Sequence, residues 1–503
     1  MNLLEQLDFY AQNHGQDIAV RSGDSFFTYE QLDHYSGRLA NAIQKRCGDD
    51  KAPVIVYGHK GIAMILCFLA AVKSGRAYCP QDISIPDARV EAVAETVQPS
   101  LIFALEDSRA DLKDAVTLSE TMEMIRREPE PVDKSFQVKG EEVFYIIFTS
   151  GSTGSPKGVQ VTADNLNHYL QWSVDLGTAR ADKQGKVFLN QAPFSFDLSV
   201  MDMYTCLASG GTLYLLDKAT QMDFRKLIPA LQDSHAAVWV STPSFADMCM
   251  AEKSFSSSLM PALEVFLFCG ETLTNATALK LMERFPQAVI MNTYGPTEST
   301  VAVTETAVTK EQALKDEPLP VGKAKPGTFL EIHKPDGSLA KTGESGEIII
   351  GGNTVSAGYF RREDLTRKAF FTSMNGYRAY RTGDKGYLDE EGNLHYQGRI
   401  DLQIKLNGYR IEIEDIEKNL LRLEEIAQAI VVPNRKEGKV RSLTAFVTGG
   451  CVPESSQKFS KEIKDKLREL LPAYMIPKKI VYMEMMPMNQ NGKVDRKQLG
   501  GLA

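Results

Sequence analysis

Cysteine, long apolar runs and a strong excess of one charge are all scarce in this sequence. The seven cysteines are widely spaced and form no Cys-x-x-Cys pair, so neither a disulfide framework nor a zinc site is expected. The longest clearly apolar stretch, Ile62–Val72, is far below the ~20 residues that cross a bilayer. The segment Met1–Tyr10 lacks the basic and then apolar pattern of a secretory leader. These absences predict a cytoplasmic protein without a transmembrane segment.

Charge and composition are those of an ordinary globular protein. The chain of 503 residues carries 57 Lys and Arg against 65 Asp and Glu, which gives a net charge of −8. A nucleic-acid binder normally has a basic face, so nucleic acid is not expected as a partner. Hydrophobic residues make up 43%, which excludes a disordered chain. At roughly 150 residues per domain, the length predicts about three units.

Buried-strand patterns alternate with helical patterns through the first 300 residues or so. Such alternation predicts an α/β fold of layered subdomains, with ligands at the carboxyl ends of strands. Ile62–Val72 is expected to be a core helix, and further helices are expected at Tyr29–Gln44, Ala163–Val174 and Asn275–Arg284. The expected strands are Val54–Tyr57, Leu101–Ala104, Val143–Phe148, Thr212–Leu216, Ala237–Val240, Val265–Phe268 and Val289–Asn292.

The pattern changes twice toward the carboxyl end. Turn signals between short strands predict a β-rich subdomain over about 328–399, within an N-terminal domain of residues 1–400. A small α+β domain is predicted for residues 401–503. Its expected elements are a helix at Ile411–Leu423, strands at Ala427–Val432 and Ser442–Val447, and a helix at Lys461–Leu471.

A loop of hydroxyls and glycines follows the strand that begins at Val143. Glycines allow close backbone approach, hydroxyls and N–H groups donate to phosphate oxygens, and a lysine supplies positive charge. The spacing differs from that of a Walker A loop, because the lysine is followed by Gly158. A surface turn is the alternative interpretation. The candidate phosphate contacts are Thr149, Ser150, Gly151, Ser152, Thr153, Gly154 and Lys157.

Further motifs in the same order make the chain resemble the adenylate-forming superfamily of acyl-CoA synthetases, luciferases and nonribosomal peptide synthetase adenylation domains. The resemblance covers most of the chain, from Thr149 to Lys493. Beside the phosphate loop, its motifs are Phe196-Asp197-Leu-Ser199, Asn292-Thr-Tyr294-Gly295-Pro296-Thr297-Glu298, Gly346-Glu347 through Ala357-Gly358-Tyr359, Tyr380-Arg381-Thr382-Gly383-Asp384, Gly398-Arg399-Ile-Asp401 through Gly408-Tyr-Arg410, and Asn491-Gly492-Lys493-Val-Asp495-Arg496.

The resemblance implies an ATP site. In that site Tyr294 would stack on adenine, and Asp384 would accept the ribose hydroxyls, although a turn-capping aspartate is the plainer interpretation of Thr-Gly-Asp. Glu298 would coordinate the Mg²⁺ that accompanies ATP, since a hard cation prefers oxygen ligands. The remaining ATP contacts implied by the resemblance are Asn292, Thr293, Gly295, Pro296, Thr297, Tyr396, Arg399 and Lys493.

Lys493 is the implied catalytic residue. Adenylate formation brings a carboxylate to the α-phosphate of ATP, and these two anions repel unless a cation screens them. The alternative is a solvated lysine near the chain end. The resemblance also implies two poses of the C-terminal domain about a hinge at Asp401. Lys493 closes the site in one pose, and the Gly408–Arg410 loop replaces it in the other.

Asp197 points to an amino acid as the substrate. Relatives that activate amino acids have an aspartate here to pair with the substrate ammonium, and a buried carboxylate without a partner is costly. A helix N-cap is the alternative role for this residue. Cys269 would contact the substrate Cα, or would be only an inert core residue. The expected pocket wall, small enough to favour an alanine-sized side chain, is Asp197, Leu198, Met201, Leu267, Cys269, Thr293, Val301 and Ala302.

Within the superfamily, the chain is most similar to free-standing members that activate D-alanine and transfer it to a phosphopantetheinylated carrier protein for D-alanylation of lipoteichoic acid. A monomeric enzyme is expected. Two other enzymes remain open, an adenylating enzyme for another small amino acid and an acyl-CoA ligase that would give Asp197 no purpose. A non-catalytic AMP-binding sensor is the third alternative, although such a sensor would not need Lys493.

Overall fold

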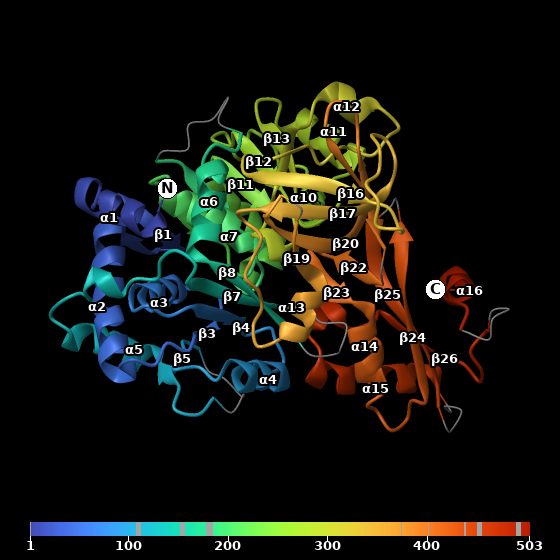
Figure 1. Ribbon diagram of the computed structural model, residues 1–503, viewed down its shortest axis with the longest axis horizontal. Coiled ribbons are helices and arrows are strands. Elements are labelled where there is room, and N and C mark those ends of the chain that lie inside the picture. Colours follow the sequence, from blue (N-terminus) through green and yellow to red (C-terminus); the bar gives the residue numbers. More distant parts are fainter. Residues whose placement is uncertain are drawn as a thin grey trace.

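The computed structural model describes residues 2–106, 112–150, 156–177, 185–373, 375–400, 402–436, 439–449, 455–488 and 494–502. It has the α/β fold that the sequence predicts, with a large N-terminal part and a smaller C-terminal part (Figure 1). Within the described ranges no helix is both long and apolar enough to cross a membrane.

The first large sheet contains the strand that precedes the phosphate loop. Its central strands are parallel, and β7 and β8 form an antiparallel pair. The continuous apolar run of β7 is buried along most of its length, as expected of a strand covered on both faces. In spatial order the strands are β18 (Gly358–Tyr359), β8 (Lys157–Thr162), β7 (Val143–Thr149), β4 (Tyr78–Asp82), β3 (Val54–Gly58), β5 (Leu101–Ala104) and β6 (Val116–Thr117).

The second large sheet supplies the other wall of the site. Its central strands are also parallel, and antiparallel strands lie at both edges. In spatial order they are β15 (Lys323–Ala324), β14 (Thr304–Ala307), β13 (Val289–Tyr294), β12 (Val265–Phe268), β11 (Val238–Ser241), β9 (Val187–Asn190), β10 (Thr212–Leu215), β1 (Ile18–Ser22) and β2 (Ser25–Thr28).

Helices fill the space between these two sheets. Helix α3 contacts β1 of one sheet and β3 and β4 of the other, and every one of its residues except Ala63 is buried. A helix that is apolar all round is stable only in such a central layer. The helices of the N-terminal part are α1 (Leu3–Asn13), α2 (Tyr29–Cys47), α3 (Ile62–Lys73), α4 (Asp87–Val97), α5 (Leu118–Arg127), α6 (Ala163–Ser173), α7 (Leu198–Ala208), α8 (Lys218–Gln221), α9 (Phe224–Ser234), α10 (Pro243–Cys249), α11 (Asn275–Arg284), α12 (Lys310–Leu314) and α13 (Glu363–Ala369), with short 3₁₀ turns η1 (Lys134–Phe136) and η2 (Thr297–Ser299).

A third sheet, antiparallel, spans the segment in which the turn signals predict short strands. Its strands are β16 (Thr328–His333), β17 (Gly346–Gly352), β19 (Phe370–Thr372), β20 (Arg378–Leu388) and β21 (Leu394–Arg399).

The C-terminal part has its own hydrophobic core, formed by residues between Ile404 and Ile480. A short hairpin precedes a sheet and helices in this part, which is orange to red in Figure 1. The elements are β22 (Gln403–Leu406), β23 (Tyr409–Glu412), α14 (Ile413–Leu420), β24 (Gln428–Lys436), β25 (Lys439–Thr448), α15 (Ser456–Leu470), η3 (Ala473–Met475), β26 (Lys479–Tyr482) and α16 (Arg496–Leu502).

Most predicted elements have nearly the predicted bounds, but two helices of the C-terminal part do not. The helix expected over Lys461–Leu471 begins five residues earlier, at Ser456. The helix expected over Ile411–Leu423 is shorter, because Ile411 and Glu412 belong to strand β23 and α14 ends at Leu420. Ile411 pairs with Ile404 across the β22–β23 hairpin, and both side chains enter the core. An apolar residue at a strand–helix junction fits either period, so the pattern alone did not separate the two.

Candidate active site

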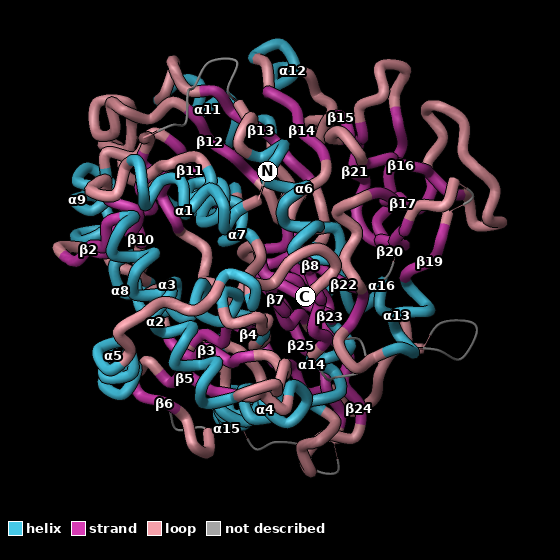
Figure 2. The backbone as a smooth tube through the Cα atoms, turned by 60° about the vertical axis from the view of Figure 1, so that its left-hand side comes forward, coloured by secondary structure: helices cyan, strands magenta, loops and turns pink. Residues whose placement is uncertain are grey.

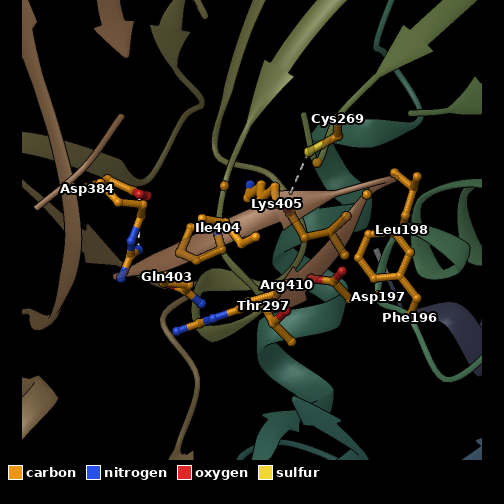
Figure 3. A pocket seen from close by; sticks show the side chains of 16 residues that line it. Phe196, Asp197, Leu198, Cys269, Thr297, Asp384, Gln403, Ile404, Lys405 and Arg410 are labelled. Atoms are coloured by element: carbon orange, nitrogen blue, oxygen red, sulfur yellow. Dashed lines mark hydrogen bonds and ion pairs between the residues drawn. The ribbon is translucent and has the colours of Figure 1, made fainter. Parts of the chain in front are cut away.

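A cavity lies where the loops at the carboxyl ends of the second large sheet, the third sheet and the C-terminal hairpin meet. Figure 3 shows Asp197 and Leu198 at the start of α7, Cys269 beyond β12, and Lys405 and Arg410 on the hairpin, all around this space. The carboxyl ends of parallel strands thus open into it, as expected for an α/β fold. The lining residues are Phe196, Asp197, Leu198, Cys269, Gly270, Gly295, Pro296, Thr297, Val301, Asp384, Arg399, Gln403, Ile404, Lys405, Gly408 and Arg410.

Asp197 is a buried acid that makes no helix cap. It immediately precedes α7, but its side chain accepts no capping hydrogen bond, so the N-cap interpretation is wrong. Burial raises the pKa of its carboxyl to about 6, although Thr297 and the charge of Lys405 act in the opposite direction. No ion pair involves Asp197 in the described part of the chain. An ammonium group entering the cavity would find a carboxylate without a counter-ion.

The wall beside Asp197 is apolar and closely packed. Leu198, Cys269 and Val301 are buried, and the Cys269 Sγ lies 3.7 Å from the Val301 carbonyl oxygen. Burial raises the pKa of the Cys269 thiol, which keeps it protonated and uncharged. Met201, also predicted for this wall, is buried in the large core and is not among the cavity-lining residues.

The backbone of this wall is held in an unfavourable conformation. Thr300 and Val301 have φ angles of 61° and 68°, a left-handed region that β-branched residues rarely adopt. Thr300 Oγ1 donates to the Thr354 carbonyl at 2.8 Å, which anchors the turn. Gly295 is required nearby, because a Cβ at that position would lie 2.5 Å from the Ala302 Cα.

The predicted ribose ligand Asp384 is buried in strand β20. Its carboxylate accepts a hydrogen bond from the Tyr294 hydroxyl at 2.5 Å and one from Arg399 at 3.0 Å, so the turn-capping interpretation is wrong. The Tyr396 ring lies 5.8 Å from that of Tyr294. Four predicted nucleotide contacts, Tyr294, Asp384, Tyr396 and Arg399, therefore lie close together at one side of the site.

Two other predicted nucleotide contacts point elsewhere. The Asn292 amide donates to the Pro320 carbonyl at 2.8 Å, and the Thr293 hydroxyl donates to the Phe268 carbonyl at 2.9 Å. Neither side chain lines the cavity. These two hydrogen bonds hold the end of β13 in place, and the residues that follow it, Gly295, Pro296 and Thr297, line the cavity.

Glu298, the predicted metal ligand, carries the strongest ion pair of the site. It is fully buried, and Arg410 donates to its two carboxylate oxygens at 2.8 and 2.6 Å, while the Tyr359 hydroxyl donates at 2.8 Å. Burial alone would raise the pKa of Glu298, but the charges of Arg410 and Lys157 lower it to about 2. An oxygen site with this strong preference for a cation fits a divalent metal as well as a guanidinium.

The β22–β23 hairpin lies against the ends of the predicted phosphate loop. Ser150 Oγ donates to the Arg410 carbonyl at 2.8 Å and accepts from the Glu412 amide at 3.2 Å. Lys157 Nζ lies 3.7 Å from Glu412. Figure 2 shows the hairpin beside β7 and β8. Of the predicted site residues, Gly151, Ser152, Thr153, Gly154, Asp401 and Lys493 lie outside the described residues.

Sequence reasoning missed the hairpin side chains that enter the cavity. Gln403 and Lys405 both line it, and Gly408 donates its amide hydrogen to Glu271 at 2.7 Å. Alternate residues of a strand share a face, so the two-residue spacing of Gln403 and Lys405 was a usable signal. The pattern does not say which surface that face meets.

A second cavity adjoins the first and shares Phe196, Thr297 and Arg410 with it. It passes between the N-terminal and C-terminal parts, with Arg89 on one side and Tyr474 on the other. The complete lining is Pro80, Gln81, Ser84, Ile85, Arg89, Val93, Ile147, Phe148, Thr149, Ser150, Pro193, Ser195, Phe196, Thr297, Tyr409, Arg410, Pro472 and Tyr474.

Two family models match the chain. Residues 7–360 match the AMP-binding enzyme model, and residues 415–493 match the model of the AMP-binding enzyme C-terminal domain. Relatives named D-alanine--D-alanyl carrier protein ligase, from Bacillus anthracis and Bacillus cereus, are each 47% identical and are aligned over 99% of both chains.

Solved structures share the fold. A nonribosomal peptide synthetase protein with adenylation and PCP domains, bound to a vinylsulfonamide inhibitor, has a TM-score of 0.82 and 26% identity, covering 99% of this chain and 84% of that one. The Vibrio cholerae adenylation domain AlmE, in complex with glycyl-adenosine-5'-phosphate, has a TM-score of 0.81 at 22% identity and covers 99% of this chain and 97% of that one.

The Arg410–Glu298 pair is expected to hold the hairpin in place. Replacing Arg410→Ala leaves Glu298 buried without its guanidinium, a loss of about 3–5 kcal/mol for a buried pair. Hydrogen exchange of the Gly408 amide should therefore accelerate markedly at pH 7. Arg422→Ala is the matched control, since Arg422 is exposed just beyond the end of α14 and donates a hydrogen bond to Asn419 at 3.2 Å. Unchanged exchange at Gly408 would show that the other hairpin contacts suffice.

Proposed function

We propose that this chain, which belongs to the AMP-binding enzyme family, is an ATP-dependent ligase that activates D-alanine and transfers it to a carrier protein. In the first step a D-alanine carboxylate oxygen bonds to the α-phosphorus of ATP, and the bond to the leaving pyrophosphate breaks. In the second, a phosphopantetheine thiol replaces AMP on the carbonyl carbon and gives up its proton. The products are AMP and a D-alanyl thioester.

The buried carboxylate of Asp197 is the observation that carries the choice of substrate. It stands without a counter-ion beside a wall of Leu198, Cys269 and Val301. The ammonium of an amino acid would supply the missing charge, whereas a fatty or aryl acid would leave the carboxylate unpaired. The packed wall leaves room for a small side chain. These features support D-alanine over the acyl-CoA ligase alternative.

The nucleotide would occupy the side of the cavity that Asp384 and Arg399 line. Asp384 would accept the ribose hydroxyls, with Tyr294 and Tyr396 beside the base, and Thr297 would contact phosphate. Glu298 would hold the Mg²⁺ that enters with ATP. Ser150, Thr149 and Lys157 flank the loop proposed to surround the outer phosphates. Lys493 would supply the positive charge that lets two anions meet.

The hairpin pose supports two alternating arrangements of the C-terminal domain, residues 401–503, about Asp401. Arg410 now occupies both oxygens of Glu298, and a magnesium ion would need the same oxygens. A buried carboxylate cannot serve both cations, so the pose described here suits the step after pyrophosphate has left. In this pose the second cavity offers a route for the phosphopantetheine thiol. The route runs from Arg89 and Tyr474 inward to Phe196.

The cellular setting follows from the proposed reaction. ATP and carrier protein are both available in the cytoplasm, where we place this enzyme as a monomer. The D-alanyl thioester would supply the D-alanylation of lipoteichoic acid in the cell wall. Another small amino acid is the alternative substrate that the cavity leaves open.

Amino-acid-dependent ATP–pyrophosphate exchange tests the substrate. D-alanine should support exchange in the presence of magnesium. The exchange rate with D-alanine should exceed the rates with L-alanine, glycine and short fatty acids. A single steric clash is worth about 1–3 kcal/mol, or roughly 10–200-fold, so Cys269→Ala should narrow the preference for D- over L-alanine by up to that factor. An unchanged ratio of D-alanine-dependent to L-alanine-dependent exchange would show that Cys269 does not select the enantiomer. Exchange driven by fatty acids alone would contradict the proposed substrate class.

Binding of D-alanine should weaken below about pH 6. The pKa of Asp197 is raised to about 6, and only the ionised carboxylate pairs with an ammonium, so the Kd should rise about tenfold per pH unit below that value. Calorimetric titration from pH 5 to pH 8 measures this slope. Asp197→Asn should bind weakly at every pH.

Without ligand, Asp197→Asn should also be more heat-stable than the parent at pH 7. The folded pKa of Asp197 lies above its unfolded value, so ionisation costs stability as pH rises from about 4 to 6. A variant that is stable and yet binds D-alanine with the parent's pH profile would exclude Asp197 as the ammonium ligand.

Lys493→Ala should separate the two steps. Adenylate formation should fall by at least about 10²–10³-fold, the usual effect of deleting one transition-state donor. Thioester formation from preformed D-alanyl-AMP should stay close to the parent rate. Lys497→Ala, an exposed lysine four positions away on α16, is the matched control. Equal loss of both steps would contradict the two-pose proposal.

A further inference from the structure

The C-terminal part carries a basic groove between helix α15 and strand β26. Every charged side chain that lines this groove is a cation. The lining is Ser456, Gln457, Ser460, Lys461, Lys464, Arg468, Lys478, Lys479, Ile480 and Val481, which we name the α15–β26 groove. Spacings of four residues along α15 place Ser460, Lys464 and Arg468 on one face.

The cations of this groove are only partly neutralised. Lys464 Nζ donates to the Lys478 carbonyl at 2.6 Å, which fastens the helix to the start of β26. Arg468 pairs with Asp465. Lys461, Lys478 and Lys479 are exposed and pair with no carboxylate in the described part of the chain. Unpaired like charges repel one another, so an anionic partner would stabilise the cluster.

This concentration of positive charge runs against the balance of the whole molecule. The chain as a whole carries a net charge of −8, but residues 456–481 contain seven Lys and Arg and only three Asp and Glu. A local field of the opposite sign steers a partner of complementary charge to one place on the surface.

The groove lies next to the wall of the second cavity. Arg468 near the end of α15 lines the groove, Pro472 and Tyr474 line the cavity, and Lys478 returns to the groove. One short connection, which includes η3, therefore joins both. A partner whose flexible arm enters the second cavity would rest its body on the C-terminal part nearby.

We propose that the α15–β26 groove is a docking surface for the acidic face of the carrier protein that delivers the thiol. This inference rests on the proposed function, because it needs a macromolecular acceptor. The groove's cations would pair with the carboxylates of that face, and the phosphodiester of the phosphopantetheine arm adds an anion. Helix α15 also contacts α4, and α4 lines the second cavity through Arg89 and Val93. In the hairpin pose one carrier protein could therefore reach the groove and the cavity at the same time.

Docking by this groove would act on the second step only. None of its residues lines the cavity that contains Asp197 and Asp384, so the adenylation chemistry should not depend on them. A lipid surface is the less fitting occupant. Among the described residues, none of the large exposed hydrophobic side chains lies in the groove.

The test compares two acceptors with the full-length enzyme. The triple variant Lys461→Glu, Lys478→Glu, Lys479→Glu reverses the unpaired cations. With the phosphopantetheinylated D-alanyl carrier protein of Bacillus cereus as the probe, its KM should rise about tenfold or more at low salt, and the parent's KM should rise with added salt. With free pantetheine, which has no protein surface, the variant should match the parent. D-alanine-dependent pyrophosphate exchange should also match.

The control is a variant with the same change of charge elsewhere, Lys226→Glu, Lys253→Glu, Lys280→Glu, all exposed on the N-terminal part. An unchanged carrier KM in the groove variant, or an equal rise in the control variant, would overturn the proposal. Groove-dependent binding of the parent to phosphatidylglycerol vesicles with unchanged carrier KM would assign the groove to a membrane instead. If the parent itself forms no thioester with either acceptor, the proposed function fails, and not only the docking surface.

Discussion

One buried carboxylate, that of Glu298, organises the centre of the molecule. A fully buried acid cannot remain ionised without a cation, and here Arg410 satisfies it from a hairpin more than 100 residues away in the sequence. The same ion pair fixes the hairpin against Ser150 and Lys157. The position of the C-terminal part therefore depends on the Glu298 carboxylate. A cation that competes with Arg410 for this carboxylate would also release the hairpin.

The sequence predicted what depends on local pattern and motif chemistry. The layered α/β fold and the central helix α3 agree with it. Asp384 and Arg399, each expected at the nucleotide, lie in hydrogen-bond contact. It could not predict which face of the β22–β23 hairpin meets the cavity, because that depends on how two separately folded cores dock. For the same reason the motif did not reveal that Asn292 and Thr293 use their side chains on backbone carbonyls. Residues whose roles depend on Lys493, Asp401 or the phosphate loop remain predictions.

Two acids in the site show how burial and charge act in opposite directions. Glu298 lies beside Arg410 and Lys157, which lower its pKa to about 2, whereas Asp197 has no paired cation and burial raises its pKa to about 6. The first carboxylate is committed to an internal partner in this pose. The second lines the cavity and is left for a ligand, and the contrast explains how two acids of one site can have separate tasks.

The left-handed turn at Thr300 and Val301 limits how this wall of the cavity can change. Such a conformation persists only where its surroundings impose it, so this part of the wall is defined by the main chain and cannot yield by rotamer change. Of the possible replacements for Val301, glycine tolerates this positive φ best, whereas another β-branched side chain would keep the strain. Leu198 and Cys269 stand on ordinary backbone, so a change at either position alters the width of the pocket without altering main-chain strain.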